Sequence, residues 1–518
     1  MTDVPPDESR GQLEKLARRG TASVVGAGFS SISGVLLVVI VTNGFSRDVA
    51  GTLFAATSAF LIVESIALLG TDTGLVKWLP AQLAAQRPVD AMRTLIVSVV
   101  PVIGLSLGAS LALYAAAPSL APLLVGSETA STMSVMLRAL ALVLPAAALY
   151  DLVVAATRGM GSMRPTVLVD NLGRLGLQAV AVLAVYLMGG GALMLALAWC
   201  LPYVLGLVVA GSWLRIQLRD ARAVPGEPTP WLTLAREFWA YTAPRAIARV
   251  TQTALKRSDV VLVAALASPA QAALYTAATR FIVLGQLFVQ SVQQALAPHL
   301  SSLFARGETR TANSVFQTAT MWSVIASWPF YLVLTGFSPL LMGVFGDGYA
   351  VASDVVLILS LTMLLSTACG PVDSVLLMAG RSWLSLRNST VALTVNVAMN
   401  VVLIPLAGIR GAAISWSVAI VVRNVLPLVQ VRRHLDMWPA TRPAVQVSLL
   451  ALACFGAVDV VVLASDLPVT IETAVLGIGT LAYLFGVWSW RDALGLGAFR
   501  SALRRRPGPT RQRLAAKV

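Results

Sequence analysis

The composition is that of a membrane protein. Of the 518 residues, 57% are hydrophobic and only 12% are charged, and the mean hydropathy is +0.79. Soluble globular proteins carry about 25% charged residues, so this composition excludes a soluble enzyme. The net charge of +14, from 38 Lys and Arg against 24 Asp and Glu, is explained by where those cations lie.

Cysteine and histidine are too sparse for a metal or disulfide framework. The three cysteines, Cys200, Cys369 and Cys454, are scattered through apolar runs without a pairing pattern. The two histidines, His299 and His434, are far apart in the sequence. We therefore expect no metal site, no disulfide and no cofactor.

Fourteen apolar segments long enough to cross a bilayer follow one another along the chain. Runs of about 18 apolar residues indicate membrane-spanning helices, and the alternation typical of barrel strands is absent. The polar N-terminal residues lack the apolar run and cleavage site of a signal peptide, so we expect the first span to be retained. The segments run near 22–45, 52–73, 94–117, 133–156, 166–188, 192–214, 239–267, 272–298, 313–337, 351–377, 386–406, 411–431, 443–464 and 470–490.

The distribution of Lys and Arg predicts how these spans are oriented. With a cytoplasmic N-terminus, 28 cations fall in cytoplasmic segments, two (Arg47 and Arg410) in outer loops, and eight within spans. Cytoplasmic loops carry the excess of Lys and Arg, so we expect both termini inside the cell. The 34 Arg against four Lys are typical of a GC-rich bacterial genome, which indicates the bacterial plasma membrane. The basic balance thus reflects topology and does not indicate nucleic-acid binding.

The chain contains an internal repeat with an offset of 222 residues. At this offset Asp151 falls on Asp373 and Gly126 on Gly348, and spans one to six fall on spans seven to twelve. An even number of spans per repeat gives two halves of the same orientation, related by an axis along the membrane normal. We therefore expect an all-α fold of two pseudo-twofold-related six-helix bundles followed by two C-terminal helices.

This repeat divides the chain into six parts. The basic tail is expected to contact anionic membrane lipids. The predicted parts are a cytoplasmic N-terminal segment (1–21), an N-lobe (22–214), a cytoplasmic linker (215–238), a C-lobe (239–435), two further helices (436–490) and a basic cytoplasmic tail (491–518).

The seventh span carries an unusual number of charges. Steps of four, three, four and three residues connect Arg245, Arg249, Gln252, Lys256 and Asp259, and Arg257 lies beside them. A charge at the bilayer centre costs about 2.5–3.5 kcal/mol unless it faces protein or water. This polar helix face is therefore expected to line a wet cavity between the halves. For Arg245, the alternative is a position at the cytoplasmic interface, before the span begins.

The eighth span repeats this pattern with amides. Gln286, Gln290 and Gln293 lie on one helical face, and Arg280 lies about a third of a turn off that face. Glutamine amides and an arginine at membrane depth again predict a polar cavity.

The second span is the repeat partner of the eighth. Its polar residues Thr57, Glu64 and Thr71 each lie seven residues apart, so they should face the same cavity. Glu64 has two interpretations. It is either a site that couples transport to a proton or cation, or a structural partner for an arginine.

Three more arginines lie within spans. Arg138 and Arg423 are further cavity candidates, whereas Arg174 follows Asp170 by one helical turn. Because residues four apart on a helix are neighbours, we expect Arg174 and Asp170 to form an intrahelical ion pair.

The predicted cavity suits an anionic ligand that carries sugars. Arg and Lys bind phosphate oxygens by charge-assisted hydrogen bonds, and amides and hydroxyls bind sugar hydroxyls. No catalytic residue is assigned. The predicted cavity residues are Thr57, Arg249, Gln252, Lys256, Arg257, Asp259, Arg280, Gln286, Gln290 and Gln293, with Glu64 as the possible coupling site.

The segment 380–413 carries a family resemblance. Its features are Gly380, Asn388, the pair Asn396 and Asn400, the triplet Leu403–Pro405 and the run Gly408–Ala413. Three further stretches are similar to the same family, namely Leu69–Leu75, Asp259 together with Leu274–Ala278, and Phe345–Tyr349. Together they resemble the polysaccharide transporter (O-antigen and oligosaccharide flippase) family of the multidrug/oligosaccharidyl-lipid/polysaccharide (MOP) flippase superfamily, over spans one to twelve.

The resemblance implies a MATE-like fold and a non-enzymatic transport function. The protein would flip a polyprenyl-diphosphate-linked oligosaccharide from the cytoplasmic to the outer leaflet, with the head group in the cavity and the lipid in the bilayer. Glycosyltransferases or a glycan polymerase of the same pathway would be its protein partners.

Four other functions are weighed against this one. Lipid II flippases are similar at Arg280, but they typically carry cavity arginines in spans one and two. Here span one has no charged residue, and span two has Glu64. A membrane glycosyltransferase or ligase needs a large outer loop or paired outer carboxylates, which the sequence lacks. Drug antiporters carry an acidic residue in span one that is missing here. A non-transporting scaffold would not need the charged face.

Overall fold

The computed structural model describes residue 26 and residues 28–221, 229–464, 468–492 and 494. Within these ranges helices are the regular structure and no strand is formed. The predicted N-terminal segment 1–21 and nearly all of the predicted basic tail lie outside the described residues.

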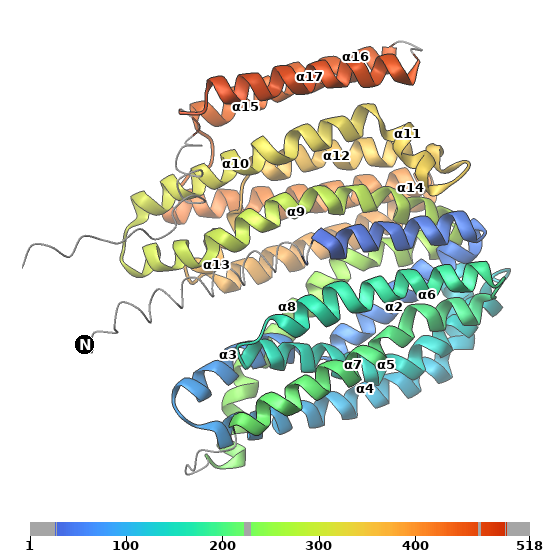
Figure 1. Ribbon diagram of the computed structural model, residues 1–518, viewed down its shortest axis with the longest axis vertical. Coiled ribbons are helices and arrows are strands. Elements are labelled where there is room, and N and C mark those ends of the chain that lie inside the picture. The colour runs from blue at the N-terminus through green and yellow to red at the C-terminus, as the bar shows by residue number, and fades with distance from the viewer. Residues whose placement is uncertain (1–25, 27, 222–228, 465–467, 493, 495–518) are drawn as a thin grey trace, which may run out of the picture.

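The first half of the chain forms an N-lobe of antiparallel helices (Figure 1). It comprises helix Gly28–Gly44, α2 (Arg47–Ala67), the short α3 (Thr71–Ala84), α4 (Pro88–Val125), α5 (Ala130–Gly159), the π-helical η1 (Thr166–Arg174) continued by α6 (Leu175–Leu187), and α7 (Ala192–Ala221).

The second half forms a C-lobe with the same order of long helices. It comprises α8 (Trp231–Leu266), α9 (Pro269–Ala305), α10 (Thr309–Gly336), α11 (Ser338–Met342), the 3-10 turns η2 (Gly343–Phe345) and η3 (Tyr349–Ala352), α12 (Ser353–Ala368), α13 (Val372–Met378) and α14 (Ser382–Leu435). The chain then continues with α15 (Arg442–Ala451), η4 (Leu452–Gly456), α16 (Ala457–Ala464) and α17 (Val469–Ser489).

Each of the fourteen predicted spans corresponds to a helical segment. Ten helices of the described residues are long and apolar enough to cross a membrane, and α10 with the bent α11 segment makes eleven. Helix α14 contributes two segments, because Gly408 (φ 54°, ψ −133°) interrupts it. The other two are α8, which carries several charges, and the shorter helix Gly28–Gly44. The protein is therefore a multi-pass helical membrane protein.

Two details differ from the predicted boundaries. The predicted span 351–377 is broken at Gly370 (φ 72°) and Pro371, which separate α12 from α13. Proline lacks the N–H that a continuous helix needs. In addition, α7 and α8 extend well into the predicted linker 215–238.

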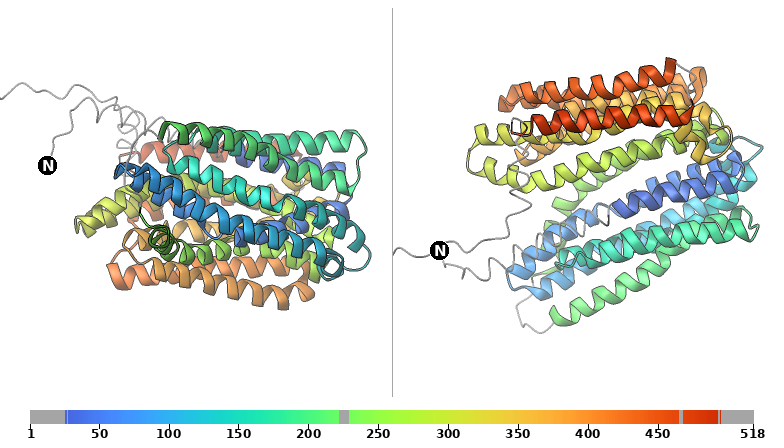
Figure 2. Two further views of the ribbon diagram at one scale, coloured as in Figure 1. Left: turned by 90° about the horizontal axis from the view of Figure 1, so that it is seen from below. Right: turned by 45° about the horizontal axis from the view of Figure 1, so that its top comes forward.

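The two lobes lie side by side as two helix bundles (Figures 1 and 2). Helices α15–α17 lie on the far side of the C-lobe, where α15, η4 and α16 pack on α10. Within the repeat, Gly126 follows α4 and Gly348 precedes η3, and both adopt a φ of 75°. Few residues other than glycine adopt this φ, but ψ is 176° at Gly126 and 6° at Gly348, so the two turns differ in backbone conformation.

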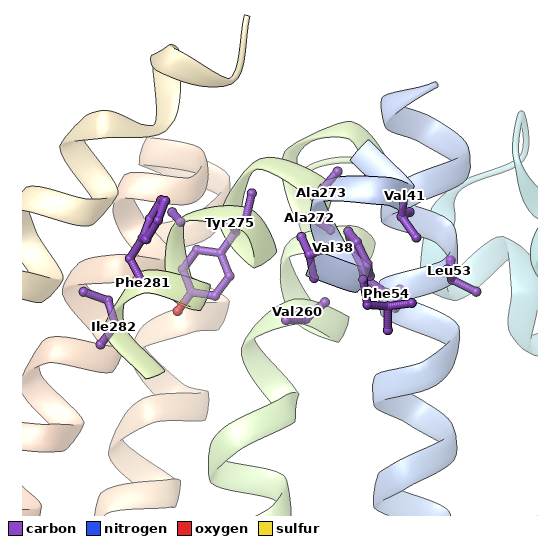
Figure 3. Close-up of a cluster of buried hydrophobic side chains, with 14 of the residues drawn as sticks. Val38, Val41, Leu53, Phe54, Val260, Ala272, Ala273, Tyr275, Phe281 and Ile282 are labelled. Carbon is purple, nitrogen blue, oxygen red and sulfur yellow. The ribbon is translucent and has the colours of Figure 1, made fainter. Parts of the chain in front are cut away.

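An apolar cluster closes the space between the lobes at one end (Figure 3). Val38 of helix Gly28–Gly44 and Phe54 of α2 pack with Val260 of α8 and Ala272 of α9, and all four are buried. Burying one such large apolar side chain stabilises a contact by about 1.5–3 kcal/mol. We call this cluster the apolar seal.

Polar contacts extend the seal at the same end. The side chain of Asn43 donates to the carbonyl oxygen of Val344 at 3.0 Å, and Arg47 donates to that of Asp347 at 2.6 Å. The Arg47 guanidinium also lies over the Tyr349 ring, 5.5 Å from its centroid. The N-lobe is thus joined to the C-lobe turns 343–349.

Candidate functional site

A cavity of about 510 Å³ lies between helix Gly28–Gly44, α2, α5, η1, α7, α8 and α9. We call it the N-lobe chamber, since most of its wall comes from that lobe. Its charged lining residues are Glu64, Asp151, Asp170, Arg174, Arg249, Lys256, Arg257 and Arg280. Three carboxylates and five cations therefore face one cavity inside the helix bundle.

A second cavity of about 200 Å³, the C-lobe chamber, lies among α8, α9, α12, α13 and α14. Lys256 lines both chambers, so the two spaces meet at this side chain. The polar residues that line the C-lobe chamber are Lys256, Gln286, Gln290, Gln293, Ser366, Thr367, Asp373, Ser374, Arg423 and Asn424.

Arg174 is neutralised within its own helix. Its guanidinium lies 2.8 Å from the Asp170 carboxylate and donates to the Tyr203 hydroxyl at 3.3 Å. The Tyr150 hydroxyl donates to the same carboxylate at 3.2 Å. The predicted intrahelical pair is confirmed, and this arginine has little free charge for a ligand.

Arg249 is neutralised by the N-lobe. It lies 3.2 Å from Asp72 at the start of α3 and 3.6 Å from Asp151 of α5. Sequence reasoning did not assign either carboxylate to the cavity. Two signals were available, because Asp72 lies in the family-like stretch Leu69–Leu75 and Asp151 is the repeat partner of Asp373.

Three cations of the N-lobe chamber have no acidic partner. Among the described residues, no carboxylate lies within 4.0 Å of Lys256, Arg257 or Arg280, although Arg280 donates to the Thr276 carbonyl oxygen at 3.4 Å. Lys256 is exposed to the chamber, and Arg257 and Arg280 are half-buried. Cations inside a membrane-spanning bundle are costly when they have no counter-charge. This cluster, which we call the cation cluster, is therefore a site where an anion would be strongly stabilised.

Glu64 of α2 faces the same chamber and also lacks a partner. It is 4% exposed, and its Oε1 atom accepts no hydrogen bond from a described residue. None of the ion pairs among the described residues includes it. Thr57 lies two turns before Glu64 on the same helix and also lines the chamber. Its hydroxyl donates to the backbone carbonyl oxygen of Leu53.

Two predicted cavity residues of α8 lie elsewhere. Gln252 is exposed and lines neither chamber, and Asp259 is buried inside the C-lobe. At 100° per residue, the lining residues Arg249, Lys256 and Arg257 occupy one arc of the helix. Gln252 and Asp259 fall past the edge of that arc, so the predicted face is shifted.

Asp259 takes part in a buried network instead. It accepts hydrogen bonds from the Tyr275 hydroxyl at 3.1 Å and from the Asn400 amide at 2.7 Å. Asn400 also donates to Asn396 at 3.2 Å. The two asparagines of the family-like segment thus join α14 to α8 and α9.

The remaining candidate arginines differ in their positions. Arg423 lines the C-lobe chamber, whereas Arg138 is exposed, with its guanidinium 5.3 Å from the Tyr114 ring centroid. Arg245 lies over the Tyr241 ring and lines neither chamber. In the described part of the chain, no group of three or more His, Cys, Asp or Glu residues is arranged to hold a metal ion.

Comparison with known families identifies the chain by sequence. Residues 19–304, more than half of the chain, match the family described as polysaccharide biosynthesis protein. Residues 244–402 match the MatE family. The two matches overlap at α8 and α9, the helices that carry the cation cluster.

One curated relative is similar over part of the chain. It is the probable low-salt glycan biosynthesis flippase Agl15 of Haloferax volcanii, 25% identical over 193 residues. That match covers 37% of this chain and 41% of the relative, so the chain spans less than half the length of the relative.

Solved structures share the fold at low sequence identity. Lipid II flippase MurJ in an inward closed conformation matches with a TM-score of 0.70 and 14% identity, over 91% of this chain and 99% of that one. A multidrug resistance MATE transporter in an inward-facing conformation matches with a TM-score of 0.65 and 15% identity, over 79% and 94%. The chain therefore belongs to the polysaccharide biosynthesis protein family and has the two-lobed fold of the MOP superfamily.

Proposed function

We propose that the protein flips a polyprenyl-diphosphate-linked oligosaccharide from the cytoplasmic to the outer leaflet by alternating access. The observation that carries this proposal is the cation cluster, Lys256, Arg257 and Arg280, which has no acidic partner among the described residues. A diphosphate supplies the missing negative charge, and its oxygens accept charge-assisted hydrogen bonds from Arg and Lys.

The relatives support the same reaction class. The Haloferax volcanii relative is named as a glycan biosynthesis flippase, and a fold neighbour is named as a lipid II flippase. The first name connects a flippase to glycan biosynthesis, and the second describes a flippase of the same fold that acts on a lipid. A cavity between two parallel six-helix lobes is the arrangement that rocking-type alternating access requires.

The closed end of the bundle supports an inward-facing state. The apolar seal lies at the end that carries Arg47 and the turn 343–349, which the Lys and Arg distribution assigns to the outside. In the proposed orientation both termini are cytoplasmic and the membrane is the bacterial plasma membrane. The chambers then take the head group from the cytoplasmic side before the seal opens.

Glu64 is proposed as the coupling residue. A buried carboxyl group that faces the chamber without an ion pair is free to bind a proton or cation during the cycle. The alternative, a structural partner for an arginine, is disfavoured because Arg174 and Arg249 have other carboxylates as partners.

The protein is proposed to act as a transporter without enzymatic activity. Glycosyltransferases or a glycan polymerase of the same pathway are its proposed partners. The outer acidic residues Asp347 and Asp354 give no support to a glycosyltransferase or ligase, because Asp354 is paired with Arg410 and Asp347 contributes its backbone to the contact with Arg47.

A lipid II flippase is the second candidate. The shared fold and the presence of Arg280 favour it. The N-lobe argues against it, because Arg174 is paired with Asp170 and the chamber residue of α2 is Glu64, where lipid II flippases typically carry an arginine. Transport of lipid II by the purified protein at the rate of other lipid-linked glycans would support this second candidate.

The decisive experiment uses the full chain in proteoliposomes with a labelled polyprenyl-diphosphate oligosaccharide. A charge-assisted hydrogen bond contributes about 1.5–3 kcal/mol, which corresponds to a change of about 10- to 150-fold. We expect Arg280→Ala to slow flipping by that factor, while Gln252→Ala, outside both chambers, leaves the rate unchanged. Wild-type rates in Lys256→Ala, Arg257→Ala and Arg280→Ala would contradict the proposal.

A further inference from the structure

We infer that the C-lobe chamber binds the sugar residue bonded directly to the diphosphate. This inference rests on the proposed function and assigns a part of the ligand to each chamber. The diphosphate lies at the cation cluster in the N-lobe chamber, and the first sugar lies in the C-lobe chamber.

The position of the C-lobe chamber places it next to the diphosphate. Lys256 lines both chambers, so a group bound beside this ammonium enters the C-lobe chamber without crossing another element. The moiety that adjoins a diphosphate is either the lipid or the first sugar. The apolar lipid belongs in the bilayer, which leaves the first sugar.

The lining of the C-lobe chamber is mostly uncharged and rich in hydrogen-bonding groups. Gln290 and Gln293 line it and make no side-chain hydrogen bond within the described ranges, so both amides are available. Ser366 and Ser374 add two hydroxyls. Amides and hydroxyls both donate and accept, as do the hydroxyls of a sugar.

Asp373 adds an oriented acceptor. Its Oδ1 accepts a hydrogen bond from the Ser385 hydroxyl at 2.5 Å, which holds the carboxylate in place. Its repeat partner Asp151 is paired with Arg249, whereas no cation lies within 4.0 Å of Asp373 in the described part of the chain. The second oxygen of Asp373 can therefore accept from a sugar hydroxyl.

The size of the chamber limits what it holds. Its volume of about 200 Å³ corresponds to about six or seven waters at roughly 30 Å³ each. This is room for one sugar ring and not for an oligosaccharide.

Binding measurements on the full chain in lipid nanodiscs test this assignment. The probes are polyprenyl diphosphate without sugar, and polyprenyl diphosphate that carries one glucose, one galactose or one N-acetylglucosamine. We expect at least one sugar-bearing probe to bind wild-type protein about fivefold more tightly than the bare diphosphate. This is the factor expected for one net hydrogen bond.

The variants separate the two chambers. Gln290→Leu with Gln293→Leu should abolish the sugar-dependent gain and leave the affinity for bare diphosphate unchanged, which also shows that the variant is folded. Asp373→Asn should reduce the gain independently. Arg280→Ala should weaken all probes equally, and Gln252→Leu should change none.

Each contrary outcome has a distinct meaning. The assignment is overturned if the sugar-dependent gain in affinity survives in both the double glutamine variant and Asp373→Asn. It is also overturned if wild-type protein binds every sugar-bearing probe no more tightly than the bare diphosphate. In both cases the proposed flippase function stands. Failure of wild-type protein to bind bare diphosphate or any sugar-bearing probe contradicts the proposed function itself.

Discussion

Arg249 of α8 forms an ion pair with Asp72 at the start of α3, with 3.2 Å between their charged atoms. Helix α8 opens the C-lobe in sequence, yet this contact holds it against the N-lobe. Lys256, two turns further along α8, has no acidic partner among the described residues. One helix thus carries both an inter-lobe ion pair and a free cation of the proposed anion site.

The Arg249–Asp72 pair is expected to stabilise the observed state. We predict that Asp72→Asn and Arg249→Gln are coupled by about 1 kcal/mol in a double-mutant cycle, because Asp72 is largely buried and Arg249 is 37% exposed. Thermal unfolding in detergent measures the coupling. The exposed pair Arg306 and Glu308, 3.0 Å apart, is the control and should give a coupling close to zero. Additive effects at Asp72 and Arg249 would refute this role.

Arg47 is expected to hold the outer end closed. Arg47→Ala removes the hydrogen bond to the Asp347 carbonyl and the contact with the Tyr349 ring. Together these contribute about 1–2 kcal/mol at an exposed site, which changes a two-state population by a factor of about 5–30. We therefore predict that the outward-open population increases by this factor.

Cysteine accessibility measures this change. Thr57→Cys, on the N-lobe chamber wall, should react faster with an impermeant thiol reagent added outside when Arg47→Ala is present, in a chain whose native cysteines are replaced by serine. Arg138→Ala, an exposed arginine that stacks on Tyr114, is the control. An unchanged labelling rate in Arg47→Ala would show that other contacts keep this end closed.

Gly51 permits the two lobes to meet. A Cβ atom at this position would overlap the carbonyl group of Pro269, at the start of α9. Overpacking of a tight contact costs about 1–3 kcal/mol, so Gly51→Ala should disfavour closure of the apolar seal. Disulfide formation between Asn43→Cys and Val344→Cys, which lie across the closed end, should become slower. Gly104→Ala, where an added Cβ meets no atom within 4 Å, should leave the rate unchanged, and equal rates in both variants would refute the prediction.

Asp459 is expected to fasten the two C-terminal spans to the C-lobe. It is 8% exposed, and its carboxylate accepts a hydrogen bond from the Thr335 hydroxyl of α10. Asp459→Ala removes this hydrogen bond to a charged group, which contributes about 1.5–3 kcal/mol, while the Thr335 hydroxyl still donates to the Leu332 carbonyl oxygen. We predict faster hydrogen exchange in Val469–Ser489, measured by mass spectrometry, while Glu472→Ala at the exposed start of α17 has no such effect. Unchanged exchange would show that apolar packing alone holds these helices.

Much of the fold followed from the sequence because the membrane restricts the alternatives. Apolar length and the Lys and Arg distribution predict fourteen spans, and the 222-residue offset predicts two equivalent lobes. Every span has a helical counterpart, and the two lobes have the same order of long helices. The break at Gly370 and Pro371 was not predicted, since a single proline in an apolar run is compatible with a continuous span.

The sequence by itself also located the charge on α8 and α9, because helical periodicity shows which cations share a face. Only the tertiary structure decided which of them are neutralised. Asp72 and Asp151 reach Arg249 from other helices, and Asn400 draws Asp259 into the C-lobe. Ion pairs and hydrogen bonds require their atoms to lie about 3 Å apart. For residues distant in sequence, that distance is set by how the helices pack. The division into two chambers that meet at Lys256 follows from that packing as well.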